Sequence, residues 1–150
     1  MQIGFTSLYT SINPPTPTIR FTVRWLVGAR WKGCPLRRDF CIAQGDDIRF
    51  IGRAFDFNGD LQDLNGVQDI VFAIYDRRGG AEISRLSMSD TEIYIGAPEE
   101  FFFNLRTEVT MPLDRRRYWH ETLIVNSDGW RNTVLHGSFE VQQTNIGALT

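Results

Sequence analysis

The chain has 150 residues, enough for one domain with a hydrophobic core and too few for two domains of ordinary size. It is 42% hydrophobic, and no apolar run comes near the roughly 18 residues of a membrane span, so we expect no contact with a membrane. The net charge of −2 argues against a nucleic-acid-binding protein, and the N-terminus has no signal-peptide pattern, so we expect synthesis in a cytoplasm.

The basic residues are almost all arginine. Of the 16 Lys and Arg residues, only Lys32 is lysine. Arginine forms paired hydrogen bonds with carboxylates and stacks on aromatic rings, so this chain suits protein interfaces, although a GC-rich genome would produce the same bias. Cys34 and Cys41 form no C-x-x-C motif, and we expect two buried or half-buried thiols.

The N-terminal region is predicted to hold one strand. Residues 1–17 are polar and contain three prolines, which block regular structure. TIRFTVRWLV, residues 18–27, alternates apolar and polar side chains, which predicts a strand with one buried face. This strand could complete its own sandwich or add to the sheet edge of a neighbouring subunit. We divide the chain into an N-terminal arm at 1–39, a β-sandwich at 40–145 and a tail at 146–150.

The stretch AQGDDIRFIGRAFDFNGDLQDLNG, residues 43–66, carries both strand and turn signals. Ile48 and Phe50 alternate with polar residues, whereas Phe55 and Phe57 have the opposite parity. The change of phase at Gly52 predicts a β-bulge there. The two Asn-Gly dipeptides in this stretch predict tight turns.

The rest of the chain is predicted to form short strands. Helical periodicity is nearly absent, and Gly-containing turn signals separate segments of strand-like pattern. Such a succession is typical of a β-sandwich or barrel. Strands are predicted at residues 70–76, 101–105, 118–125 and 133–141, with weaker signals at 82–88 and 92–95. The residues predicted to share one face are Ile70, Phe72 and Ile74 in the first strand, Phe101, Phe103 and Leu105 in the second, and Thr133, Leu135, Gly137, Phe139 and Val141 in the last.

Several motifs in a fixed order carry a family resemblance. They are QGD (44–46), DLNG (63–66), FAIYD (72–76), RY before WHETLIV (117–125), DG (128–129) and LHGSFEV (135–141). On these motifs, residues 40–143 resemble the small immunoglobulin-like β-sandwich of tailed bacteriophages, found at the N-terminus of upper-baseplate proteins and as a stand-alone virion protein. The resemblance implies an antiparallel, immunoglobulin-like sandwich, and the arm at 1–39 has no counterpart in that family. Family members often have glycine before the tyrosine of the late strand, where this chain has Arg116 and Arg117.

We expect the polar residues at the start of the 43–66 stretch to have a structural role in turns. Gly45 would give backbone freedom, and the neighbouring aspartates would accept turn hydrogen bonds. Residues 56–63 resemble the start of a calcium loop, but Leu61 and Val67 stand where an EF-hand needs glycine and glutamate. The two histidines lack metal-ligand spacing, so each is expected to be a hydrogen-bonded structural residue. We therefore predict no metal and no other cofactor.

No catalytic constellation is apparent. There is no nucleophile elbow and no phosphate-binding glycine loop, and the carboxylate pairs at 46–47 and 99–100 fit solvated turns better than a glycosidase dyad. We expect a protein that is not an enzyme.

Arginine and tryptophan are favoured interface anchors. The run at 115–117 could bind carboxylates of a neighbouring subunit or be a solvated turn. The predicted protein-interface residues are Arg20, Arg24, Trp25, Trp31, Arg115, Arg116 and Arg117.

The resemblance implies a structural component of a phage virion, made in the host bacterial cytoplasm. Its size favours a capsid decoration or cement protein that binds the major capsid protein through arm and sandwich, as a homo-oligomer and by analogy a trimer. The alternatives are a tail or baseplate adaptor that binds tail proteins, and a carbohydrate-binding adhesion module that uses Trp119, Trp130 or Tyr94. We expect that deleting residues 1–33 leaves a folded or nearly folded sandwich but abolishes incorporation into particles. Failure to fold would show that the strand at 18–27 pairs within its own chain.

Overall fold

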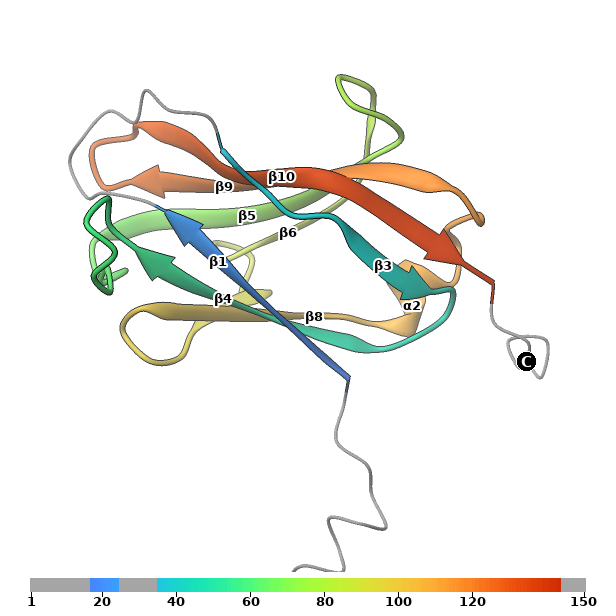
Figure 1. Ribbon diagram of the computed structural model, residues 1–150, viewed down its shortest axis with the longest axis horizontal. Helices are drawn as coiled ribbons and strands as arrows, with labels where there is room; N and C mark the ends of the chain where they lie inside the picture. The colour runs from blue at the N-terminus through green and yellow to red at the C-terminus, as the bar shows by residue number, and fades with distance from the viewer. Residues whose placement is uncertain (1–16, 25–34, 144–150) are drawn as a thin grey trace, which may run out of the picture.

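Two β-sheets lie face to face in the computed structural model, which describes residues 17–24 and 35–143 (Figure 1). Sheet A has four strands in the order β1-β4-β8-β7. Its strands are β1 (Thr18–Arg24), β4 (Ile48–Phe55), β8 (Glu100–Leu105) and β7 (Ile93–Ile95).

Sheet B has six strands, in the order β2-β10-β9-β5-β6, with β3 also paired to β10. A short helix, α2 (Thr107–Thr110), connects β8 to β9. Among the described residues, no helix has the length and apolar character of a membrane span. The strands of sheet B are β2 (Leu36–Arg37), β3 (Phe40–Ala43), β5 (Val67–Tyr75), β6 (Glu82–Ser87), β9 (Arg117–Asn126) and β10 (Arg131–Gln142).

The predicted all-β, immunoglobulin-like sandwich is confirmed, but it is not antiparallel throughout, because one edge of each sheet is parallel. Strand β1 runs parallel to β4, and both β2 and β3 run parallel to β10. The inner pairs β4–β8, β5–β9 and β9–β10 are antiparallel. A tight hairpin forces neighbouring strands to be antiparallel, whereas strands far apart in sequence can align either way. The direction of these edge strands is therefore invisible to local sequence patterns.

Strand β1 belongs to the sandwich of its own chain. It pairs with β4 along its whole length, from Thr18 opposite Arg49 to Arg24 opposite Phe55. Its inward side chain Phe21 is only 4% exposed. The sandwich therefore includes residues that the sequence analysis assigned to a separate arm, because this strand supplies part of the core. Residues 25–27 of the predicted strand lie outside the described residues.

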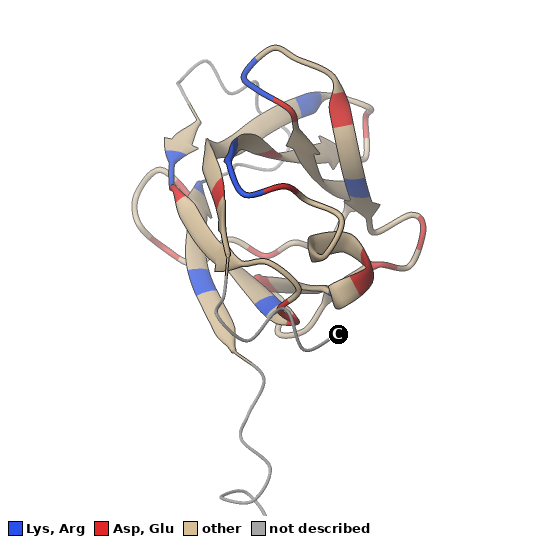
Figure 2. Cartoon of the chain, turned by 90° about the vertical axis from the view of Figure 1, so that its right-hand side faces the viewer, with Lys and Arg blue, Asp and Glu red and all other residues tan. Residues whose placement is uncertain are grey.

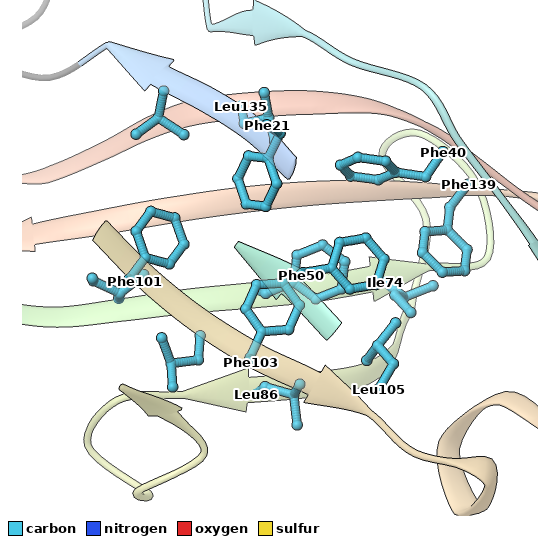
Figure 3. Close-up of a cluster of buried hydrophobic side chains, with 14 of the residues drawn as sticks. Phe21, Phe40, Phe50, Ile74, Leu86, Phe101, Phe103, Leu105, Leu135 and Phe139 are labelled. Carbon is cyan, nitrogen blue, oxygen red and sulfur yellow. The ribbon is translucent and has the colours of Figure 1, made fainter. Parts of the chain in front are cut away.

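Phenylalanine rings fill the space between the sheets (Figure 3). Phe21 of β1 contacts Phe40, Phe50 and Phe101 edge to face, with ring centroids 5.8, 6.5 and 5.7 Å away. Phe50 also stacks on Phe103 at 5.1 Å. Offset and edge-to-face aromatic pairs add to the stabilisation that burial alone provides. Rings from both sheets and from the edge strand β1 thus form one continuous core.

The alternation of side chains along the sequence correctly predicted the inward faces of the central strands β5 and β8. In β5, Ile70, Phe72 and Ile74 are each at most 1% exposed. In β8, Phe101 and Phe103 are fully buried. The weaker predicted strands at 82–88 and 92–95 are present as β6 and β7.

The bulge predicted at Gly52 is wrong. Strand β4 keeps unbroken register through this residue with both of its neighbours. A Cβ at Gly52 would lie 2.8 Å from the ring of Phe21 and still closer to the ring of Phe101. Glycine is needed because two aromatic rings occupy the place of its side chain. No change of phase occurs within β4, because Phe55 lies half-buried on its outward face and Phe57 lies in the loop after the strand.

A register shift does occur in β10, between Thr133 and Leu135. As a result, Val134 and Leu135 are both 1% exposed, although they are neighbours in sequence. The prediction that Thr133 faces inward is therefore wrong, because the shift places it on the other face. Phe139, after the shift, faces inward as predicted.

The predicted turn chemistry is confirmed in the loop that follows β4. The carboxylate of Asp56 accepts from the backbone N–H of Asn58 at 2.8 Å, and Asp63 accepts from that of Asn65 at 2.8 Å. Gly59 has a φ of 88°, which glycine adopts without strain. These short side chains thus organise turns.

The turn between β3 and β4 is tied to the connection around α2. Gly45 has a φ of 87°, as its position in the QGD motif predicts. The side-chain amide of Gln44 donates to the backbone carbonyls of Met111 and Leu113 at 2.9 and 2.8 Å. Asp47 accepts from the backbone N–H of Thr107 at 2.8 Å rather than from its own turn. The polar start of this stretch is therefore architectural and holds two distant connections together.

The cysteine prediction is wrong where the structure describes it. Cys41 lies in β3 with its side chain exposed, on the outward parity of a strand at the sheet edge. Cys34 lies outside the described residues.

Candidate interaction surfaces

The arginine run at 115–117 lies just before and at the start of β9, and all three side chains are exposed. Together with the end of β10, these residues line a shallow, open depression of about 510 Å³. The tyrosine that follows the run, Tyr118, is buried. This position makes the depression a candidate contact surface at one end of the sandwich.

Two of these arginines already have partners within the chain. The guanidinium of Arg116 lies 4.1 Å from the ring centroid of Tyr118 and donates to the carbonyl of Asp76 at 2.8 Å. Arg117 forms an ion pair with Glu140 at 3.6 Å. Within the described chain, no hydrogen bond or ion pair engages Arg115. The run therefore divides into residues that support the turn and one that projects outward.

Arginine fits this turn without backbone strain. Among the described residues, Thr91 is the one non-glycine residue with a positive φ, so Arg116 and Arg117 have ordinary backbone conformations. The glycine expected at this point from the sequence resemblance is not required here. Arg116 instead stacks on the tyrosine that follows.

The predicted arginines of β1 lie elsewhere. Arg20 and Arg24 point outward from sheet A, at its edge, whereas the run at 115–117 adjoins sheet B. The carbonyl of Arg20 accepts a hydrogen bond from the guanidinium of Arg38 at 3.1 Å, which covers part of this edge. Trp25 and Trp31 lie outside the described residues. The predicted residues thus do not form one surface, and Figure 2 shows basic and acidic segments interspersed over the end of the molecule that it views.

The outward side of sheet A carries an apolar strip that sequence analysis did not single out. Across the sheet, Arg20, Ile51, Phe102 and Tyr94 stand opposite one another in successive strands. Residues opposite one another in a ladder project to the same face. Phe102 and Tyr94 stack with ring centroids 5.5 Å apart, and Tyr94 remains 48% exposed. We call this surface the sheet A face.

Polar pairs flank the apolar strip on both sides. Toward the start of β4, Arg49 donates to Asn104 at 3.1 Å, and its guanidinium lies 5.6 Å from the ring centroid of Phe102. Toward the end of β4, Arg53 forms an ion pair with Glu100 at 3.4 Å. An apolar centre bordered by polar and charged groups is typical of protein-interaction surfaces.

One signal for this face was present in the sequence. In the FFFNL segment, Phe102 has the opposite parity to its buried neighbours. Its aromatic ring must therefore project from the other face of the strand. The alignment of Phe102 with Ile51 and Tyr94 depends on strand pairing and could not be read from the chain.

The aromatic residues named as carbohydrate contacts differ in accessibility. Trp119 is only 6% exposed, because the guanidiniums of Arg37 and Arg78 lie 5.4 and 4.9 Å from its ring centroid. Trp130 and Tyr94 are 45% and 48% exposed. Trp119 is therefore a packed residue rather than an open platform for a sugar ring.

The prediction of a structural, hydrogen-bonded histidine is confirmed for His120. Its Nε2 donates to the carbonyl of Arg38 at 2.6 Å, and its ring lies between Phe40 and Phe72. Burial lowers the pKa of His120 from its usual 6.5 to about 4, against the opposing effect of that carbonyl. His136 packs edge to face on Trp119, and burial, reinforced by nearby arginines, lowers its pKa.

Several other carboxylates serve turns and ion pairs. The carboxylates of Asp56 and Asp63 accept backbone hydrogen bonds, and Glu99 and Glu100 both lie within 4.0 Å of Arg53. Within the described ranges, no three His, Cys, Asp or Glu side chains gather in a way that could hold a metal ion.

No family model matches the sequence, and no curated protein matches it. Solved structures do. The N-terminal domain of ORF48 from phage TP901-1 has a TM-score of 0.51 at 9% identity, over 83% of this chain and 98% of the phage domain.

Two further solved structures are similar. The fibronectin(III)-like modules of Clostridium thermocellum CbhA have a TM-score of 0.39 at 8% identity, over 83% of this chain and 98% of that chain. CopC from Methylosinus trichosporium OB3b has a TM-score of 0.40 at 15% identity, over 71% of this chain and 86% of that chain. At these identities the similarity concerns the fold alone.

Proposed function

We propose that this chain is a non-enzymatic structural component of a tailed-phage virion, in which the sandwich is a rigid module that binds neighbouring virion proteins. One observation carries the proposal. The similarity to the phage TP901-1 domain extends over 98% of that domain, so it concerns a whole module and not a shared hairpin. The motifs of the β4–β10 region point to the same class of phage sandwich.

Within the virion, we favour a tail or baseplate location over the capsid exterior. The sequence resemblance includes the N-terminal domains of upper-baseplate proteins, and the phage structure that matches is also an N-terminal domain. A capsid decoration protein was favoured by size, as one small domain with a separate arm that would clamp capsomers, but strand β1 of that arm pairs within its own sandwich.

The surfaces of the sandwich support binding rather than turnover. The sheet A face presents an apolar strip between polar pairs, and the depression at 115–117 presents Arg115 beside the end of β10. The depression is wide and shallow, whereas enzyme sites are enclosed clefts with converging polar groups.

The test uses the purified chain and particles produced without it. Isolated tails and isolated capsid shells are incubated separately with the protein, sedimented, and assayed for bound chain. We expect binding to tails at a fixed stoichiometry. Binding to shells with a gain in their heat resistance would instead support the decoration protein. Binding to host glycans without binding to either particle would support the adhesion module and overturn the proposal, as would binding to none of these.

A further inference from the structure

The sheet A face is charged differently at its two ends. The end toward the start of β4 carries Arg49 and Arg106, which line one small depression together with Asn104 and Asp47. The carboxylate of Asp47 keeps its negative charge while it accepts from the Thr107 backbone N–H. Two guanidiniums face this one carboxylate around the depression, so this basic end is positive.

The opposite end is acidic and belongs to the same face. Leu61 forms an isolated antiparallel bridge with Phe55, the last residue of β4, so the two side chains share the outward side of sheet A. Leu61 is 51% exposed, and the loop around it, residues 56–63, carries three aspartates and no basic residue. Glu99 and Glu100 add two further carboxylates to this acidic end. Its positive charges are Arg53 and, on β1, Arg24.

The acidic loop is held in a fixed shape. Asp56 accepts from two backbone N–H groups, at 2.8 and 3.0 Å, and Asp63 fixes the following turn. Within the described chain, the carboxylate of Asp60 receives no hydrogen bond or ion pair. Arg49 and Phe55 are six residues apart in one strand, so the basic and acidic ends are separated by about 20 Å. They cannot neutralise each other within one molecule.

We propose that the sheet A face binds a second copy of this chain in an antiparallel, two-fold arrangement. Turning one copy end for end lays its acidic loop over the partner's Arg49 and Arg106 and brings the two apolar strips together at the centre. A two-fold contact is self-complementary, because each charge pair occurs twice. The match of opposite charges around an apolar strip is the observation that favours a second copy over another protein.

This inference rests on the proposed assembly role, since it names one partner of that module. It is tested on the purified protein alone, so its failure and a failure to bind tails are separate results. Sedimentation velocity across a range of protein concentrations and salt concentrations measures the oligomeric state. We expect a monomer–dimer equilibrium that salt weakens, because exposed charge pairs are screened.

Charge reversal gives the sharper test. Arg49→Glu and Asp60→Arg should each weaken self-association by about tenfold or more, because each places like charges together at both symmetric contacts. Mixing the two variants should restore the dimer. In the mixed dimer one contact is the reversed pair, and the other is the original pair.

Arg85→Glu is the matched control. Arg85 is an exposed arginine of strand β6 in sheet B, bonded to Glu82 of its own strand. The Arg85→Glu variant should dimerise like the original protein. Phe102→Arg, which places a charge in the apolar strip, should abolish the dimer. Circular dichroism confirms that each variant is folded.

Three results would overturn the proposal. One is a monomer even at about 1 mM protein, where weak association would be visible. Another is a dimer that Arg85→Glu weakens and Arg49→Glu does not. The third is growth beyond a dimer at high concentration, which indicates a head-to-tail contact in place of a two-fold one.

Discussion

The carbonyl oxygen of Arg38 lies 2.6 Å from Nε2 of His120, inside the sandwich. This contact joins the connection between β2 and β3 to the centre of sheet B. His120 is fully buried, and its other ring nitrogen, Nδ1, has no hydrogen-bond partner in the described structure. A neutral ring satisfies the carbonyl with one N–H, whereas a protonated ring would place an unpaired N–H and a charge among phenylalanines.

We therefore predict that stability falls as the pH is lowered from 6.5 toward 4. The pKa of His120 is about 4 in the folded protein and near 6.5 when unfolded, so only the unfolded chain takes up a proton in this window. This difference in proton uptake by His120 lowers the free energy of unfolding by roughly 2 kcal/mol at pH 5. Urea unfolding between pH 4 and 8 measures the change.

Two variants separate this effect from others. His120→Gln should flatten the pH dependence in this window, whatever its effect on stability at pH 8. His136→Gln should flatten it less, since His136 is less deeply buried. The pKa of Asp39 is lowered by the hydrogen bond from the Ser138 backbone, so its contribution is lost only below about pH 3.8. An unchanged slope in His120→Gln would refute the assignment.

Gly137 allows the Arg38 carbonyl to approach His120. A Cβ at this position would lie 2.7 Å from the carbonyl carbon of Arg38 and closer still to its oxygen. We predict that Gly137→Ala destabilises the fold by about 1–3 kcal/mol, because the backbone of the edge connection must move. Thermal unfolding measures it. Gly96→Ala is the control, since a Cβ there meets Phe102 at an ordinary 3.7 Å and should cost little. Equal effects of the two changes would contradict the explanation.

Strand β1 tests where the folded unit begins. Phe21 is 4% exposed and contacts three other phenylalanine rings, so Phe21→Ala should lower the free energy of unfolding by roughly 3–5 kcal/mol. Its exposed neighbour Thr22 provides the control, and Thr22→Ala should change it by less than about 0.5 kcal/mol. Denaturant unfolding of both variants measures the two changes in the free energy of unfolding.

For the same reason, deleting residues 1–33 should leave a chain that no longer unfolds cooperatively, since the deletion removes Phe21 and Val23 from the core. A truncated chain as stable as the full one would show that β1 is dispensable, as expected for a strand that pairs with a neighbour.

The arginine run contains its own comparison. Arg116 stacks on Tyr118 and donates to the carbonyl of Asp76, so Arg116→Ala should destabilise the protein by about 1 kcal/mol. Arg115→Ala should leave stability within about 0.5 kcal/mol, because no bond within the described chain engages its side chain. Thermal melts in the same buffer compare them. A larger loss for Arg115→Ala would mean that the roles of the two residues are reversed.

Local patterns were enough to identify the fold class and much of the core. The alternation in β5 and β8 placed Phe72, Phe101 and Phe103 inside, and all three are buried. The turn glycine Gly59 adopts the positive φ that its Asn-Gly motif predicts. These features depend on neighbours along the chain, through side-chain periodicity and backbone sterics, so the sequence determines them directly.

The tertiary structure decided everything that depends on which strands meet. Gly52 and Gly137 are required by rings and a carbonyl that arrive from distant segments, and no local signal distinguishes them from turn glycines. The partner of β1 and the row that joins Phe102 to Ile51 and Tyr94 follow from long-range pairing. Such pairing is chosen by the burial of the whole core, to which each strand contributes only one face, so it cannot be read from any single stretch of the chain.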